Sequence, residues 1–411
     1  MHQRDRIGDR LHLFLALGGI IALFGPVTVT EIAFAPMAVF FIVRVFNTFP
    51  VWIHGFGQPV VLSMLALAGW MMISLRWSGD PVLGWGEIGE LRWLLLIGLL
   101  YPVIENRGML IAALCIGVLL GQLGQLAEVF NGLGVDPLAS VVGQYPGRIS
   151  GWWHPVVGGS ILVAALGLHL PAAVFGRGRW RGLGVLGSSI TLVGIIAIET
   201  RGAWIAAVLL VVSVFGFALF TKRLKWKQGA LVALVGVLVV ASAGWVMRDA
   251  LADRLGETRA EITQIIDGQY DSYTGARVEM GKLAIEAIEN HPFVGVGAGG
   301  YQHWASTHDP DADVHAHAHN ALLQIWSTLG LVGVVLWALV LATIWRSAWR
   351  LWDQTPSGVY GLGPVFALLG LMLASLTDSV QINTQTAALL GLVAALSPAQ
   401  RPHIDEPIKN E

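Results

Sequence analysis

Long apolar segments, separated by short polar connections, run along nearly the whole chain. A transmembrane helix needs about 20 mainly apolar residues, and somewhat shorter segments are tolerated. Twelve segments meet this requirement, at 11–25, 29–46, 58–76, 90–104, 108–127, 156–175, 183–198, 203–220, 229–247, 319–345, 358–377 and 383–398. The pattern therefore predicts an all-α polytopic membrane protein with about twelve transmembrane helices.

One long polar segment interrupts this pattern between the ninth and tenth apolar segments. Residues 248–318 contain twelve acidic and five basic side chains, a formal net charge of −7. Val278, Ile285 and Ile288 recur at helical spacing within this segment, and Pro292 ends the run. We therefore expect four regions: spans one to nine at 1–247, a small helical cap at 248–318, spans ten to twelve at 319–398, and a tail at 399–411.

The basic residues of the short connections indicate the orientation of the spans. Lys and Arg concentrate in cytoplasmic loops. They occur here at the N-terminus, in "GRGRWRG" (176–182), in "TKRLKWKQ" (221–228), and at Arg346 and Arg350. These positions all fall on one side of the membrane if both termini are cytoplasmic. The cap at 248–318 is then expected on the outer face.

The composition is typical of a membrane protein, and the cysteine content argues against some kinds of site. The chain is 55% hydrophobic and only 13% charged, whereas soluble domains are about 25% charged. Its single cysteine, Cys115, lies in an apolar run, which argues against a disulfide framework and a thiolate cluster for zinc. The first apolar segment lacks a small-residue cleavage site, so we interpret it as an uncleaved span. We find no cofactor motif, and we expect no nucleic-acid partner.

Ionisable residues within or beside spans are costly and therefore indicate function. On the predicted topology seven of them share the outer face: Arg76, Arg148, His154, Arg201, Arg277, His319 and Asp378. Arginine on that face also runs against the usual distribution of positive charge.

Some of these residues have an equally plausible structural role. Arg76 could extend to the lipid headgroups while its apolar stem stays buried. Arg148 could pair with a carboxylate of the acidic cap, and Asp378 could cap a helix. Arg201 is different because its "TRG" turn lies between two spans with almost no loop. This position favours a functional role for its guanidinium group.

Arg277 lies in the first turn of its predicted helix, where the helix dipole disfavours a cation. A bound anion would reverse this effect, because the helix N-terminus and the guanidinium group would then act together. The structural alternative is a surface ion pair with Glu279 or Asp271.

The histidine-rich stretch "HAHAHN" (315–320) is compatible with a metal site or a catalytic base. His315 and His319 have a spacing that can bind zinc on a helix, but a third ligand is missing. The aspartates at 309–313 resemble the start of a calcium loop without its glycine and closing glutamate. We therefore expect no metal.

His319 differs from its histidine neighbours because it begins an apolar span. A neutral imidazole at the mouth of a helical bundle can accept a proton near pH 7, whereas His315 and His317 are expected to support it. Several arginines at one membrane face suggest a lipid-linked phosphate or pyrophosphate ligand. Together these features predict group transfer from a lipid pyrophosphate to an alcohol.

Five motifs resemble the O-antigen ligase and polymerase superfamily. They are "GRISGWWHP" (147–155), "ETRGAW" (199–204), "HPFVGVGAGGY" (291–301), "HNALLQIWSTLGLVG" (319–333) and "TDSVQIN" (377–383). They occur in order over most of the chain and are strong in combination. His154 departs from the family pattern, in which an uncharged polar residue is expected.

The resemblance implies a metal-independent, inverting glycosyltransferase of the GT-C type in the bacterial inner membrane. Such ligases move a glycan from undecaprenyl pyrophosphate to a sugar of the lipid A core at the periplasmic face. It implies that Arg201 and Arg277 bind the pyrophosphate and that His319 is the base. The residues expected to line the site are Arg76, Arg148, His154, His317 and Asp378.

Three alternatives stay open. An O-antigen polymerase has the same motifs, although the compact length and sizeable cap favour a ligase. A protein O-oligosaccharyltransferase would usually be longer, with an additional C-terminal region. A twelve-span secondary transporter would place polar residues at mid-membrane and show a repeat between its halves, neither of which is evident here.

Overall fold

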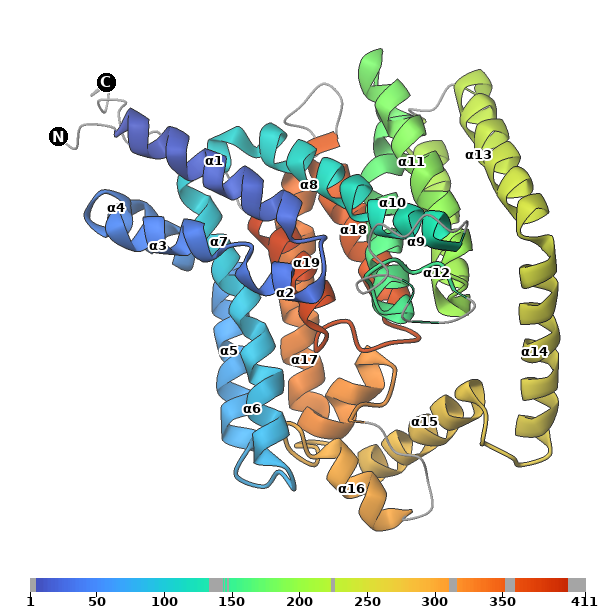
Figure 1. Cartoon of the computed structure of the whole chain (residues 1–411). Helices are drawn as coiled ribbons and strands as arrows, with labels where there is room; N and C mark the ends of the chain where they lie inside the picture. The colour runs from blue at the N-terminus through green and yellow to red at the C-terminus, as the bar shows by residue number, and fades with distance from the viewer. Residues whose placement is uncertain are drawn as a thin grey trace.

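The computed structural model describes residues 5–132, 143, 145, 148–222, 226–309, 316–351 and 359–397. Regular structure in these ranges is entirely helical (Figure 1). The helices are α1 Arg6–Ala22, α2 Val27–Ile32, α3 Ala35–Val43, α4 Val45–Phe56, α5 Pro59–Ser74, α6 Pro81–Glu90, η1 Leu91–Leu94, α7 Leu95–Leu100, η2 Tyr101–Asn106, α8 Arg107–Gly121, α9 Leu123–Gly132, α10 Pro155–Phe175, α11 Arg179–Ala197, α12 Arg201–Phe220, α13 Trp226–Val246, α14 Arg248–Ile266, α15 Tyr273–Asn290, α16 Tyr301–His308, α17 Ala321–Arg350, α18 Val359–Ala374 and α19 Thr384–Ala395.

Six helical stretches in the described ranges are long and apolar enough to cross a membrane. They are Pro81–Asn131, Pro155–Phe175, Arg179–Ala197, Arg201–Phe220, Gly229–Val246 and Ala321–Arg350. Shorter apolar helices occur at Val27–Val43, Pro59–Ser74, Leu362–Ala374 and Thr384–Ala395. The all-helical, membrane-spanning architecture is thus confirmed, whereas the number of twelve spans stays a prediction.

Three predicted spans differ in detail from the observed helices. The apolar run 29–46 is divided among α2, α3 and the start of α4, and Pro36 occupies the first turn of α3, a position that proline favours. The predicted spans 90–104 and 108–127 lie in one continuous helical stretch that contains the 3₁₀ segments η1 and η2. Pro102 lies in the first turn of η2, and its missing N–H interrupts regular α-helical bonding.

Helix α10 forms the centre of the bundle and packs against α11, α12 and α18. Of its apolar window, 89% is buried inside the protein. Helix α13 is the opposite case, because only 6% of its window is buried although its mean hydropathy is 2.3. Helix α13 therefore presents most of its surface to the surroundings, which for an apolar helix of this length are lipid.

The polar segment predicted as a cap contains α14, α15 and α16. Helix α14 continues in the direction of α13, and α15 and α16 lie across one end of the bundle (Figure 1). Helix α15 begins where Ser272 Oγ accepts a hydrogen bond from the Gly275 N–H at 3.0 Å. The predicted helix is therefore present.

The residues that recur at helical spacing are not the buried ones, however. Val278 and Ile288 are only half-buried and Ile285 is exposed. The residues packed between α15, α16 and the start of α17 are Met280, Leu283, Ala284, Ala287, Val296, Tyr301, Trp304, Ala305 and Ala318. Small alanines let the helices approach closely, and helical periodicity of large side chains does not reveal this contribution.

Candidate functional site

Helices α10, α12, α17 and α19 begin close together at the end of the bundle that carries α14–α16. Thr200 Oγ1, at the start of α12, donates a hydrogen bond to the Pro155 carbonyl at 2.9 Å. Asn320 Nδ2, which caps α17, donates to the Leu376 carbonyl at 3.0 Å. The positive ends of these helix dipoles therefore lie near one another, where they favour a bound anion.

The glycine of the "TRG" motif allows this convergence. A Cβ atom at Gly202 would lie 2.0 Å from the Oγ1 atom of Thr377. Glycine is thus required for the start of α12 to pack against the connection between α18 and α19. Arg201 directly precedes Gly202 and Asp378 directly follows Thr377, so this contact brings Arg201 and Asp378 into one neighbourhood.

His319 and Asp378 form an ion-pair contact. The Nδ1 atom of His319 lies 3.7 Å from Oδ1 of Asp378, and their side chains are 18% and 4% exposed. Burial tends to raise the pKa of Asp378, but interaction with His319 and the neighbouring His317 holds the pKa of this carboxyl below its usual value. Asn383 Nδ2 donates a hydrogen bond of 3.2 Å to the other carboxylate oxygen. Asp378 is therefore a fixed anion beside the imidazole.

The backbone of His319 adopts an unusual conformation, with φ of +50°. Left-handed φ is uncommon for a residue other than glycine and costs on the order of 1–3 kcal/mol. Hydrogen bonds on both sides stabilise it: the Ala318 N–H donates to Gln324 Oε1 at 3.0 Å, and Asn320 Oδ1 accepts from Leu322 and Leu323, each at 3.0 Å. The chain thus turns His319 toward Asp378 before α17 begins.

His317 completes a group of possible metal ligands. Its ring contacts that of His319 edge-on, with centroids 4.2 Å apart. One ligand atom from each of His317, His319 and Asp378 lies within 4.8 Å of the others, close enough to hold a metal ion. Asp378 is therefore a third candidate ligand that spacing in the sequence does not reveal, and the expectation that no metal binds stays a prediction.

Arg277 is a half-buried guanidinium group close to Asp378. Burial lowers its pKa, the carboxylate of Asp378 opposes this shift, and the positive charges of Arg201 and Arg254 add to it. Among the residues that the structure describes, Arg277 has neither a hydrogen bond nor an ion pair. A buried charge without a direct partner is costly, and a bound anion would relieve this cost.

Arg201 is instead held by the cap. Its Nη1 atom lies 2.5 Å from Glu261 Oε2 and donates to Thr274 Oγ1 at 2.9 Å, and Nη2 lies 3.4 Å from the other oxygen of Glu261. Glu257 is 3.6 Å away. Burial tends to raise the pKa of Glu261, but the hydrogen bonds from Arg201 and Thr274 lower it overall. Glu261 is therefore an anion in contact with Arg201.

Arg148 and His154 belong to the same neighbourhood. Burial and the nearby charges of Arg254 and Arg277 lower the pKa of Arg148. Burial also lowers the pKa of His154; the carboxylate of Asp378 opposes this, while Arg148, Arg277 and His319 add to it. These electrostatic contacts place both residues beside the proposed site.

Arg76 is exposed after α5, and among the described residues its side chain has no hydrogen bond or ion pair with this group. The structure thus brings together seven of the eight residues named from the sequence: Arg148, His154, Arg201, Arg277, His317, His319 and Asp378. A role for Arg76 stays a prediction.

A comparison with protein families gives one match at this site. Residues 186–338 match the model of the family described as O-antigen ligase. This match covers 153 of the 411 residues and supports a relationship of the chain to the O-antigen ligase superfamily. The matched segment runs from α11 into α17 and contains Arg201, Arg277 and His319. No curated protein shows significant similarity to the chain.

The charged face of α14 was not predicted from the sequence. Arg254 is paired with Glu257 and is electrostatically coupled to Arg148, Arg277 and Glu261. The spacing of Arg254, Glu257 and Glu261 is i, i+3, i+7, which places them on one helix face. That spacing is a signal that could have identified them.

A buried carboxylate from α6 was also missed. Glu87 Oε2 accepts a hydrogen bond from the Gly299 N–H at 3.0 Å, and Glu87 Oε1 accepts from Gln324 Nε2 at 3.0 Å. Gln324 in turn accepts from the Ala318 N–H. Glu87 therefore connects the glycine-rich "GVGAGGY" loop to the backbone that precedes His319. Gln324 of the "HNALLQ" motif has a structural role in this connection, because it hydrogen-bonds both Glu87 and the Ala318 N–H.

Proposed function

We propose that the protein is an O-antigen ligase, a metal-independent, inverting glycosyltransferase of the GT-C type. It would transfer a glycan from undecaprenyl pyrophosphate to a sugar hydroxyl of lipid A-core at the periplasmic face of the bacterial inner membrane. The observation that carries the proposal is the grouping of Arg201, Arg277 and the His319–Asp378 pair at one end of the bundle. The match of residues 186–338 to the O-antigen ligase family supports it.

In this proposal the arginines bind the pyrophosphate of the donor. Arg277 has no direct partner among the described residues and can accept the anion without losing a contact. Arg201 exchanges Glu261 for a phosphoryl oxygen, because both are anionic acceptors for the same N–H groups. Arg148 and Arg254 add positive charge around the same place. The helix N-termini of α10 and α12 also favour the bound anion, because they are the positive ends of the helix dipoles.

His319 is the proposed base. The acceptor hydroxyl oxygen forms a bond to the anomeric carbon of the donor sugar from the face opposite the leaving group. The bond from that carbon to the pyrophosphate oxygen breaks, and undecaprenyl pyrophosphate leaves with the electron pair. His319 takes the hydroxyl proton, and the carboxylate of Asp378 stabilises the resulting imidazolium. Arg201 and Arg277 stabilise the negative charge on the leaving group.

In this scheme the remaining candidate residues line the site where the two substrates bind. His154 and Arg148 lie beside Asp378 and Arg277, and His317 contacts the His319 ring. The cap at 248–318 would close the periplasmic side over the donor, because it supplies both Glu261 and Arg277. The grouping of ionisable residues at one end of the bundle favours this proposal over a transporter, which would need them at mid-membrane.

The direct test is glycan transfer by the purified protein in phospholipid vesicles, with a lipid-linked glycan as donor and lipid A-core as acceptor. We expect His319→Ala, Arg201→Ala and Arg277→Ala each to lose at least about 100-fold in rate while remaining folded, because general base catalysis alone contributes about 10²–10⁴-fold. Full activity of the His319 variant would remove the base assignment.

Deletion in the host distinguishes a ligase from a polymerase, which the family also includes. Loss of a ligase leaves bare lipopolysaccharide core while the lipid-linked polymer accumulates. Loss of a polymerase leaves core that carries a single repeat. Lipopolysaccharide gels separate these outcomes, and the second pattern would replace the proposed activity with polymerisation.

A further inference from the structure

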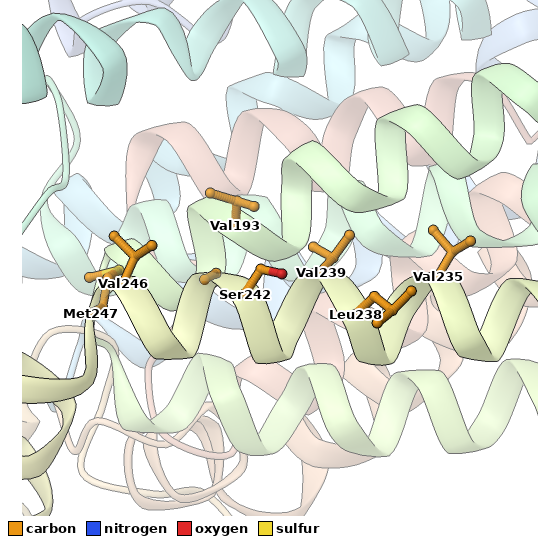
Figure 2. A pocket seen from close by; sticks show the side chains of 8 residues that line it. Val193, Val235, Leu238, Val239, Ser242, Val246 and Met247 are labelled. Atoms are coloured by element: carbon orange, nitrogen blue, oxygen red, sulfur yellow. The ribbon is translucent and has the colours of Figure 1, made fainter.

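Side chains that could bind an ion are concentrated at one end of the bundle. The hollow between α11 and α13 has a volume of about 500 Å³, and among the eight residues that line it Ser242 is the only polar one (Figure 2). Its lining therefore offers no imidazole, thiol or carboxylate. His317, His319 and Asp378 contrast with it, because one ligand atom from each lies within 4.8 Å of the others. We call these three residues the His317–His319–Asp378 group.

The geometry of this group suits a small transition-metal ion. Zinc binds imidazole nitrogen and carboxylate oxygen at about 2.0–2.2 Å, so adjacent ligand atoms around a tetrahedral ion are roughly 3.4 Å apart. Nδ1 of His319 and Oδ1 of Asp378 are 3.7 Å apart, and the two imidazole rings meet edge-on with centroids 4.2 Å apart. Small rotations of the side chains are therefore enough to bring the three ligand atoms to coordinating distance.

Neighbouring contacts hold two of these ligands in position. Asn383 Nδ2 donates a hydrogen bond of 3.2 Å to Oδ2 of Asp378, so Oδ1 stays directed at His319. The left-handed backbone of His319, with φ of +50°, keeps its ring beside that oxygen. Hydrogen bonds that orient metal ligands raise the affinity of a site, commonly by about 10–100-fold. The fold thus supplies both the ligands and their support.

The ligand types and the surrounding charge indicate which ion binds and how tightly. Two imidazoles with one carboxylate favour zinc and similar transition metals, whereas magnesium and calcium take mainly oxygen ligands. The group supplies three protein ligands, and water completes the tetrahedral shell. Arg277 and Arg148 lie near the same groups, and their positive charge opposes a divalent cation. We therefore expect reversible binding, much weaker than at a structural zinc site with four protein ligands.

We propose that the His317–His319–Asp378 group binds Zn²⁺ and that the bound ion inhibits the transferase. The inhibition rests on the proposed function, in which His319 is the base. The two nitrogens of a neutral imidazole share one proton and one lone pair. When Nδ1 of His319 binds zinc, the proton lies on Nε2, which can no longer accept the hydroxyl proton of the acceptor. Catalysis itself remains metal-independent. The sequence alone indicates no third ligand, and the fold supplies one in Asp378.

The first experiment measures zinc binding without reference to catalysis. Zn²⁺ is titrated into the purified full-length protein, freed of metal with EDTA and held in micelles of an uncharged detergent, in competition with a fluorescent zinc indicator. We expect Asp378→Asn and His317→Ala each to raise the Kd at least about tenfold. His303→Ala, at an exposed histidine of the cap, is the matched control and should bind zinc as the wild-type protein does. An unchanged Kd in a folded Asp378→Asn protein would rule out the site.

The second experiment tests whether the ion occupies the base. Diethyl pyrocarbonate modifies accessible imidazole nitrogens, and the modification of His319 is followed by mass spectrometry of its peptide. Zinc at ten times the Kd should slow this modification roughly tenfold, because about nine-tenths of the sites are then occupied. Asp378→Asn should remove the protection, and magnesium at the same concentration should give none. Modification of His319 that zinc leaves unchanged would refute the inhibition.

Transfer assays separate this proposal from the proposed function. The same zinc concentration should lower the rate of glycan transfer roughly tenfold, and EDTA should restore it. Zinc that protects His319 in a protein without glycan transfer would support the site and overturn the proposed reaction. Undiminished transfer at saturating zinc would refute the inhibition and leave the reaction intact. Transfer that is lost in EDTA and restored by zinc would make the metal catalytic and would contradict both proposals.

Discussion

Glu261→Gln tests whether the carboxylate of the cap competes with the donor for Arg201. Glu261 contacts Arg201 with both oxygens, at 2.5 Å and 3.4 Å. Glutamine keeps the size of the side chain and an oxygen acceptor but removes the negative charge. If Arg201 must release Glu261 before it binds the pyrophosphate, the variant should bind the donor more tightly than the wild-type protein does.

The size of the effect follows from the exposure of the pair. The side chains of Arg201 and Glu261 are 20% and 12% exposed, so solvent screens the interaction only in part. Hydrogen bonds to charged groups contribute about 1.5–3 kcal/mol when buried, and exposed ion pairs contribute about 0.2–1 kcal/mol. A value of about 1 kcal/mol predicts an approximately fivefold lower KM for the donor, with little change in kcat.

The assay is the rate of glycan transfer as a function of donor concentration, with Glu286→Gln as the control. Glu286 is an exposed carboxylate of the same acidic segment, so the control makes the same change of net charge away from Arg201. A KM that stays constant or rises in a folded Glu261→Gln protein would refute the exchange at Arg201. An equal fall in the control would assign the effect to net charge instead.

Four further outcomes are expected. Asp378→Asn should lower kcat by on the order of 10²-fold, since it removes the anion that stabilises the protonated His319; wild-type kcat would refute this role. Glu87→Gln should reduce activity because the amide NH2 group cannot accept one of the two hydrogen bonds, and Glu87→Asp should reduce it because the shorter side chain cannot reach both donors; unchanged kinetics would show that this link is dispensable. Gly202→Val should lower the free energy of unfolding by about 1–3 kcal/mol, as overpacking does, because Thr377 occupies the space that the valine side chain would need. An unchanged melting curve would contradict the close contact. EDTA should leave transfer intact, whereas inhibition that zinc reverses would assign the ligands His317, His319 and Asp378 to a metal.

The helical architecture and much of the site follow from local patterns in the sequence. Uninterrupted apolar runs predict transmembrane helices because the bilayer forbids unpaired backbone groups. The cost of ionisable residues near spans pointed to Arg201, Arg277, His319 and Asp378 without any knowledge of their contacts. Helix starts such as Ser272 and Asn320 likewise have recognisable capping residues.

Pairings between distant segments could not be predicted in the same way. The contacts of Arg201 with Glu261 and of Glu87 with Gln324 join residues 60 and 237 positions apart, and no periodicity connects such positions. The buried face of α15 combines two alanines, Ala284 and Ala287, with Met280 and Leu283, and the spacing of the large branched residues does not indicate it. Local reasoning thus named candidate side chains but not which of them are held by a partner.

The His319–Asp378 contact has a consequence for how this protein can be divided. The family-matched segment ends at residue 338, whereas the carboxylate comes from the turn after α18, and His154 and Glu87 come from upstream helices. A chimaera that received only residues 186–338 would gain His319, Arg201 and Arg277 together with Glu261, but it would lack Asp378, the carboxylate beside His319. Transferring the proposed site to another protein would require most of the chain, so we expect it to evolve as a whole bundle rather than as an exchangeable module.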